Sequence, residues 1–311
     1  MKRFPKSARW LGSALFMKQL FYFSAFAGLV LALMGAGAAA AEVQNGPGTP
    51  REQYQALRKA LEKAGPAYYF QSTNDAERQA IVAGVDKVML GLLELVDKNP
   101  KEPFALDALT QVVSLEYWLN THTIHPGFGK DSPQARAIAL LLRDHLQSDQ
   151  LIETCKRASF GMRQECETFL RTVLSQNPHR EVQGAACLRL AQLLADRVEK
   201  LDLLKEQPLM VKRYEALYGR DFIETLRSRD RATVMKEAET FYDQASEKYD
   251  DVKLPYNETV GSVARTDLFE IRHLGVGMMT QDFGGEDQDG RPLKLSDYRG
   301  KVVLLYFWSE F

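Results

Sequence analysis

The stretch "NPHREVQGAACLRLAQLLADRVEKL", residues 177–201, decides the fold class of this chain. Its apolar residues recur with the period of an amphipathic helix and not with the alternation of a strand. Three small residues, Gly184, Ala185 and Ala191, would allow a neighbouring helix to approach closely. The sequence therefore predicts a helix over Val182–Val198 that packs against other helices.

The same helical period continues on both sides of this stretch, from residue 51 to residue 276. Asn74 with Glu77, and Ser132 followed by Pro133, are typical of helix starts. Besides Val182–Val198, the expected helices are 51–64, 75–95, 102–119, 134–146, 151–158, 162–174, 210–217, 221–226, 232–249 and 261–274. The fold class expected for residues 51–276 is thus mainly α.

The arrangement of these helices is left open between a helical bundle and stacked helix pairs. Residues 177–201 resemble a tetratricopeptide-type helix pair, although no repeat of about 34 residues runs along the chain. The charged runs "DRVEK" (196–200) and "RSRDR" (227–231) are expected on solvated helix faces. This part of the chain by itself indicates a soluble helical scaffold and nothing sharper. A protein-interaction module, with a protein partner on the helical region, is the alternative function.

The N-terminal residues 1–41 are typical of an export signal, because five basic residues and no acidic one accompany the apolar run Leu20–Gly35. Ala39-x-Ala41 fits a cleavage site, and residues 42–50 are a linker by composition. The alternative is an uncleaved membrane anchor over Leu20–Ala41. The expected location is outside the cytoplasm in a periplasm-like space, with membrane attachment only if the signal is uncleaved.

The charge balance excludes nucleic acid as the expected partner. The formal net charge is −1, and residues 42–311 hold 35 basic and 41 acidic residues, a net of −6. A nucleic-acid-binding surface needs a basic face to neutralise phosphates.

Three cysteines, Cys155, Cys166 and Cys187, leave at least one thiol unpaired within the chain. Cys155 and Cys166 would lie roughly 16 Å apart on a continuous helix, too far for a disulfide. Gly161 could interrupt that helix and bring the two together. Two alternatives therefore remain: a Cys155–Cys166 bridge, or three small apolar core residues.

The pattern changes after residue 274, where "GVGMMTQDFGGEDQDGRPLKLSDYRGKVVLLYFWSEF" (275–311) begins. Asp289-Gly290 is a hairpin-turn signal between short segments at 282–286 and 291–295. Residues 302–307, "VVLLYF", are a continuous apolar run typical of a central strand covered on both faces. The sequence predicts a β-hairpin followed by the first central strand of an α/β sheet.

Residues 277–311 resemble the opening of a thioredoxin-like domain of the TlpA/ResA and alkyl-hydroperoxide-reductase/thiol-specific-antioxidant redoxin superfamily. The matching residues are Gly277, Asp282, Phe283, Asp287, Asp289, Gly290, Leu295, Ser296, Asp297, Tyr298, Arg299, Gly300, Lys301, Phe307 and Trp308. The chain departs at Thr280-Gln281, where the family usually has Ala-Pro, and at Phe311, where Trp is commoner.

This resemblance implies an exported thiol–disulfide oxidoreductase or peroxide-reducing antioxidant redoxin. Its substrate would be a protein thiol or disulfide, or a peroxide. In that superfamily the first cysteine of Cys-x-x-Cys follows the aromatic residue at position 311, and its thiolate attacks the substrate. The resemblance implies that Lys301, Phe307, Trp308 and Phe311 frame the site, with Trp308 as its wall. No catalytic residue, cofactor site or metal site is expected within residues 1–311.

Three explanations are compatible with a sequence that stops just before this motif. The reading frame is truncated, or a UGA codon for selenocysteine is misread as a stop at the nucleophile's position. In the third explanation, the protein is a non-catalytic helical interaction module with a vestigial tail. The nucleotide sequence downstream of codon 311 discriminates among them.

Overall fold

The computed structural model describes residues 48–306, apart from 65, 124–126, 129–130, 276–277 and 288. The expected export signal 1–41 and most of the linker 42–50 lie outside the described residues. All the elements below belong to the unit that begins after Ala39.

The described chain is mostly helical, as the sequence predicts. The α-helices are α2 (Pro50–Ala64), α3 (Pro66–Tyr69), α4 (Asp75–Lys98), α5 (Ala105–His122), α6 (Pro133–Asp144), α7 (Ile152–Ser159), α8 (Gln164–Gln176), α9 (Arg180–Glu206), α10 (Pro208–Tyr218), α11 (Arg220–Ser228), α12 (Arg231–Lys248) and α13 (Val260–His273). Two short 3₁₀ helices, η2 (Pro255–Asn257) and η3 (Leu295–Tyr298), and two strands, β1 (Gly284–Glu286) and β2 (Pro292–Lys294), complete the list.

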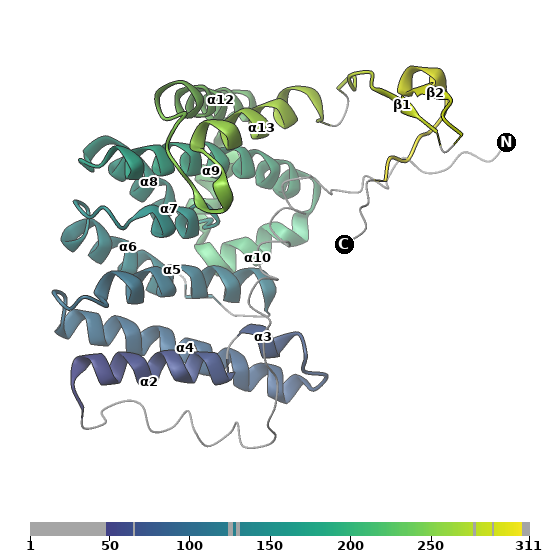
Figure 1. The fold of residues 1–311 in the computed structure, drawn as a ribbon. Coiled ribbons are helices and arrows are strands. Elements are labelled where there is room, and N and C mark those ends of the chain that lie inside the picture. The colour runs from purple at the N-terminus through teal and green to yellow at the C-terminus, as the bar shows by residue number, and fades with distance from the viewer. Residues whose placement is uncertain are drawn as a thin grey trace. The chain divides into compact units, whose positions relative to one another are not determined.

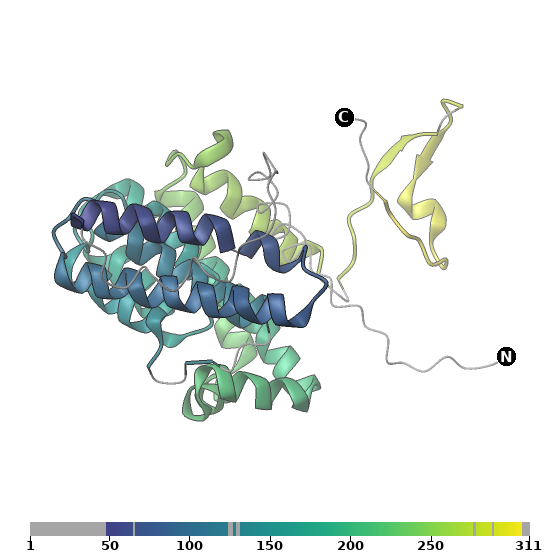
Figure 2. The ribbon, with the colours of Figure 1, turned by 90° about the horizontal axis from the view of Figure 1, so that it is seen from below.

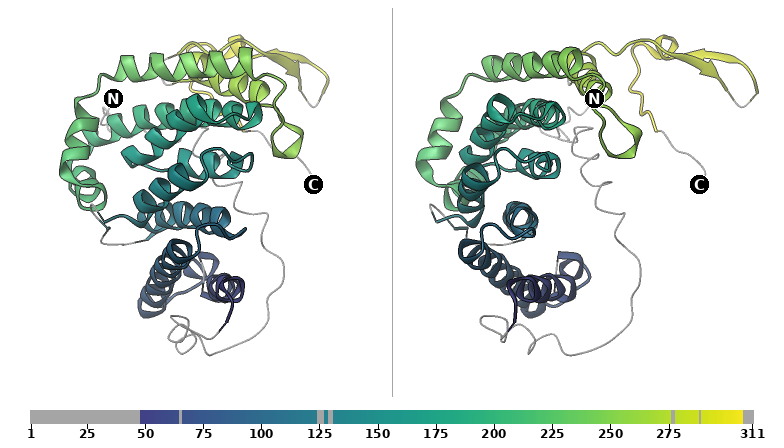
Figure 3. Two further views of the ribbon diagram at one scale, coloured as in Figure 1. Left: turned by 90° about the vertical axis from the view of Figure 1, so that its left-hand side faces the viewer. Right: turned by 60° about the vertical axis from the view of Figure 1, so that its left-hand side comes forward.

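Helices that follow one another along the chain pack in pairs, and the pairs lie in successive layers (Figure 1). Figure 2 shows α2 and α4 side by side, and α4 contacts α5 in the next layer. The pairs α5–α6 and α7–α8 follow, and α12 with α13 forms the last layer (Figure 3). Each pair buries apolar surface against the next, so one hydrophobic core runs through the stacked helices.

Helix α9 occupies the centre of the later layers, where it contacts α7, α8 and α12. It is buried on several sides, because its apolar residues are spread around its axis and are not gathered on one face as the amphipathic period predicted. For one of the three small residues, Gly184, the structure shows a close approach of the kind that the sequence predicts. A Cβ added to Gly184 would lie 3.1 Å from Cβ of Tyr249 and 3.2 Å from Cγ2 of Val252. Gly184 therefore permits the close approach of the segment that follows α12.

The two helix starts with capping signals, those of α4 and α6, agree with the sequence prediction, with one difference in the caps. Ser132 caps α6 by accepting a hydrogen bond from the Ala135 N–H at 3.1 Å. Asn74 caps α4 by accepting from the Ala76 N–H at 2.8 Å. Glu77 does not bond back to the Asn74 N–H, which donates instead to the Ser72 hydroxyl, and that hydroxyl donates to Glu77 at 2.7 Å. The direct hydrogen bond from the Asn74 N–H to Glu77, expected for a capping box, is thus replaced by two hydrogen bonds through the Ser72 hydroxyl.

The C-terminal hairpin forms where the sequence predicts it. Strands β1 and β2 pair antiparallel, with Gly285 opposite Leu293. Gly290 lies in the turn at φ +76°, a conformation that glycine adopts without steric cost.

The strand expected over 302–307 is not formed by its described residues, 302–306. Val302, Leu304 and Tyr306 are 104%, 90% and 81% exposed. A strand requires hydrogen bonds to a neighbouring strand, and the described residues supply no such neighbour to this run.

Candidate functional site

The turn after the hairpin, residues 294–301, is the described part of the site that the redoxin resemblance implies. The Lys294 N–H donates to Asp297 Oδ2 at 2.9 Å, which fixes the start of η3. The Lys301 N–H donates to the Tyr298 carbonyl oxygen at 3.0 Å, and Gly300 takes φ +82°. The motif Leu-Ser-Asp-Tyr-Arg-Gly-Lys is therefore one continuous hydrogen-bonded turn.

Asp282 ties this turn to the segment before the hairpin. Its two carboxylate oxygens accept hydrogen bonds from the Ser296 N–H and from the Ser296 hydroxyl, each at 2.8 Å. The Leu295 N–H donates to the Phe283 carbonyl oxygen at 3.0 Å beside them. The two ends of the hairpin segment are thus closed on each other. The link was not predicted from sequence, although both Asp282 and Ser296 belong to the matching residues.

The Asp282 link predicts a pH dependence of the hairpin. The Ser296 hydroxyl and N–H bind the ionised carboxylate, so they lower the pKa of Asp282. A carboxyl group whose pKa is lowered in the folded state stabilises the fold at pH values above its ordinary pKa. This stabilisation is lost as the pH falls through the folded-state pKa. We expect the link to be intact above about pH 4 and to weaken below it.

The Ser296 amide resonance, followed by NMR during acid titration, measures this link. It should report a midpoint below that of an ordinary aspartate, and the transition should be absent in Asp282→Asn. A midpoint at the ordinary value in the unchanged protein would contradict the link.

Of the four framework residues, only Lys301 is described. Its ammonium nitrogen lies 5.6 Å from the centroid of the Tyr298 ring, within the range of a cation–π contact. Phe307, Trp308 and Phe311 lie outside the described residues. The structure therefore describes the polar turn that precedes the framework residues. The placement of the aromatic framework residues stays a prediction.

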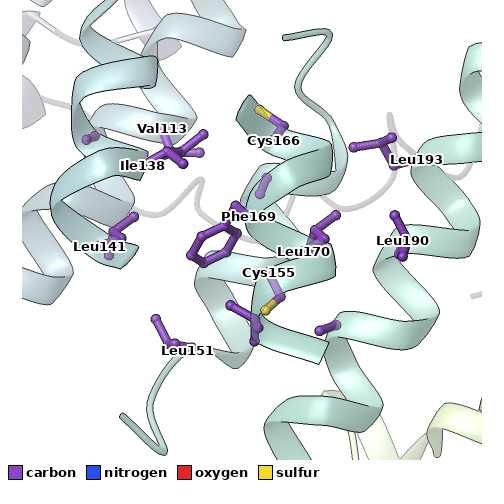
Figure 4. Close-up of a cluster of buried hydrophobic side chains, with 14 of the residues drawn as sticks. Val113, Ile138, Leu141, Leu151, Cys155, Cys166, Phe169, Leu170, Leu190 and Leu193 are labelled. Atoms are coloured by element: carbon purple, nitrogen blue, oxygen red, sulfur yellow. The ribbon is translucent and has the colours of Figure 1, made fainter. Parts of the chain in front are cut away.

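The three cysteines are free and buried, so the alternative of a Cys155–Cys166 bridge is not formed. Helix α7 does end before Gly161, as that alternative required. In the view of Figure 4, Phe169 and Leu170 lie between the two sulfur-bearing side chains. The Cys166 thiol instead donates a weak hydrogen bond to Gln134 Oε1 at 3.4 Å. Cys155 and Cys166 serve as core residues.

Burial raises the pKa of each of the three thiols, Cys155, Cys166 and Cys187, to about 12. At neutral pH the thiolate population is then about a thousandfold smaller than for a thiol at the ordinary value, because each pKa unit is a factor of ten. An attacking thiol must be both ionised and accessible. The geometry gives these cysteines no redox role.

Thiol titration tests this conclusion. An aromatic disulfide reagent at neutral pH should leave all three thiols unmodified in the native protein, and should modify all three in denaturant. A thiol that reacts within seconds in the native protein would contradict the burial described here.

A buried carboxylate, Glu116, is the centre of a polar cluster that the sequence did not indicate. It accepts from Arg163 Nε at 2.7 Å, from the Ser132 hydroxyl at 2.8 Å and from the Gln134 N–H at 2.8 Å. Glu116 is fully buried and Arg163 nearly so. Arg163 also donates to the Leu217 carbonyl oxygen at 3.2 Å, so the cluster joins α5, α6 and α10.

A second buried arginine, Arg197 of α9, corrects an expectation. It belongs to the run "DRVEK", expected on a solvated face, yet it is 1% exposed. Arg197 Nη2 donates to the carbonyl oxygens of Met162 and Arg163 at 3.2 and 3.0 Å. Burial lowers the pKa of Arg197, against the effect of Glu167, whose carboxylate lies 3.5 Å from Nη1.

The run "RSRDR" lies largely on a solvated face as expected, with Arg229 as the exception. Arg229 of this run pairs with Glu167 at 3.2 Å and with Glu237 at 3.4 Å. Although burial acts in the opposite direction, Arg197, Arg171 and Arg229 hold the pKa of Glu167 below its usual value. Both clusters are ion pairs that position helices, although Nε and Nη1 of the buried Arg197 have no hydrogen-bond acceptor among the described residues. Their geometry assigns them no chemical step.

Within the described ranges, no group of three His, Cys, Asp or Glu side chains is arranged to hold a metal ion. In the same part of the chain, no helix combines the length and apolar character needed to cross a bilayer.

Comparison with protein-family models, with curated proteins and with solved structures found no match for this chain.

Proposed function

We propose that this protein is an exported thiol–disulfide oxidoreductase or peroxide-reducing redoxin, in which residues 277–311 open a thioredoxin-like domain. The observation that carries the proposal is the closed hairpin and turn. β1 and β2 pair around Gly290, and the Asp282–Ser296 link joins the two ends of this segment. Asp282, Gly290 and Ser296, which close this segment, are among the residues that carry the resemblance to the redoxin superfamily.

In this proposal the chemistry belongs to a cysteine or selenocysteine that follows the aromatic residue at position 311, as the resemblance implies. A thiolate or selenolate at that place would attack a protein disulfide or a peroxide, and a second cysteine would resolve the intermediate. Residues 302–306 would then become a covered strand, which accounts for a run of apolar residues that is otherwise costly to expose. Trp308, with Phe307 and Phe311, would form the site wall.

The test compares two forms of the protein. The product expressed from the natural gene should reduce insulin disulfides or hydrogen peroxide. Residues 1–311 expressed alone should not turn over either substrate catalytically, because Cys155, Cys166 and Cys187 are buried. Equal activity in the two forms, or activity in neither, would overturn the proposed reaction.

A second candidate function is a helical scaffold for a protein partner, with stacked helix pairs of the tetratricopeptide type. The core cluster favours it. Among the described residues, this core runs from Tyr54 to Leu268 and includes none of residues 278–306. The stacked helices therefore bury their apolar surface without help from the hairpin.

A pull-down with the whole chain and with a variant that lacks residues 278–311 separates the two functions. Recovery of the same partner by both forms supports the scaffold. Loss of the partner with the tail assigns binding to the C-terminal segment.

A further inference from the structure

The methionines of the described chain differ sharply in exposure. Met278 is 55% exposed and Met279 is 88% exposed. Met89 is fully buried in α4, and Met162 is 5% exposed beside α8. Met210 and Met235 are half-buried. Two adjacent, solvent-exposed thioethers therefore stand apart from the methionines of the helical core.

The position of this pair is defined by a turn. The Met278 N–H donates to the Gly275 carbonyl oxygen at 3.0 Å, directly after α13 ends. Met279 follows, and the hairpin segment starts three residues later at Asp282. The two thioethers lie in the connection between the helical part and the hairpin, outside the core cluster.

We propose that Met278 and Met279 are an oxidation site for hydroperoxides. In each event the peroxide O–O bond breaks and one oxygen forms a bond to the thioether sulfur. The other oxygen leaves as water, or as an alcohol from an organic peroxide. The sulfur loses two electrons and the peroxide gains them, so each methionine consumes one equivalent. A dithiol-dependent sulfoxide reductase restores the thioether.

Among the methionines of the described residues, the fold makes this pair the fastest to oxidise. A peroxide reaches Met89 or Met162 only when the surrounding helices open, and such openings are rare in a packed core. A sulfoxide at Met278 or Met279 meets water and replaces no packed contact of the helical core. Oxidation of the pair therefore leaves the stacked helices intact. This inference stands whether or not the proposed redoxin activity is found.

The experiment treats the purified protein with hydrogen peroxide and follows each methionine by peptide mass spectrometry. We expect Met278 and Met279 to gain oxygen at least about tenfold faster than Met89 and Met162. Met210 and Met235, which are half-buried, provide an internal comparison and should react at intermediate rates. In denaturant all six should react at similar rates, which shows that the fold creates the difference.

The double variant Met278→Leu/Met279→Leu is the matched control. It should lose the fast phase of peroxide consumption while its far-UV circular dichroism and its thermal midpoint stay unchanged. Native-state oxidation of Met89 or Met162 as fast as that of Met279 would overturn the proposal. An equal rate for Met279 in the native and denatured protein is expected, whereas strong protection in the native protein would also overturn it.

Discussion

Replacing Glu116 by alanine is expected to lower the free energy of unfolding by about 3–5 kcal/mol, the usual cost of breaking a buried ion pair. Glu116 is fully buried and accepts hydrogen bonds from Arg163, Ser132 and the Gln134 N–H. Without the carboxylate, the Arg163 guanidinium stays buried with its Nε–H lacking an acceptor. Urea unfolding followed by circular dichroism measures the loss.

Two controls define this result. Glu94 pairs with Lys98 at 2.6 Å on the surface of α4, and Glu94→Ala should change stability little, because exposed pairs contribute little. The double variant Glu116→Leu/Arg163→Met removes both charges and should recover most of the loss. If Glu116→Ala is no more destabilising than Glu94→Ala, the buried cluster does not have the role given to it here.

Replacing Phe169 by alanine is expected to cost about 3–5 kcal/mol, the range for truncating a buried aromatic side chain. Phe169 of α8 is fully buried and lies in the cluster with Ile138, Leu141 and Leu151 (Figure 4). Its removal leaves a cavity between α6, α7 and α8 that these short helices cannot fill completely. A fall in the thermal midpoint and in the urea midpoint checks the prediction.

Phe269 of α13 is the matched control, because it is 41% exposed. Phe269→Ala removes the same atoms from a site that is already partly solvated, so its cost should be well below that of Phe169→Ala. Similar losses for the two variants would contradict the packing of α8 at the centre of the core.

The sequence predicted the helices because their apolar period is local information. α9 was expected from the helical period of residues 177–201, and α6 from Ser132-Pro133 with the helical pattern after it. The short helix α3 was missed, since its four residues give no measurable period. Most boundaries differ by a few residues. The largest difference is at the end of α9, which was expected at Val198 and continues to Glu206.

Contacts between polar residues that are far apart in the sequence could not be predicted from the sequence alone. Arg197 lies in a charged run that looks like a solvated helix face, and only the packing of α9 against its neighbours buries it. Glu116 shows no local sign of its partner, which is 47 residues away at Arg163. The Asp282–Ser296 link joins residues 14 positions apart, across a hairpin whose turn alone could be predicted. The exposure of residues 302–306 depends on neighbouring strands, which local pattern does not encode.

The redoxin proposal depends most directly on the coding sequence that follows codon 311 in the natural gene and its transcript. The proposal predicts an in-frame Cys-x-x-Cys, or a UGA codon followed by Gly-x-Cys, directly after Phe311. A UAA or UAG codon at that place, with no Gly-x-Cys in frame beyond it, would contradict the proposal and leave the helical scaffold as the function.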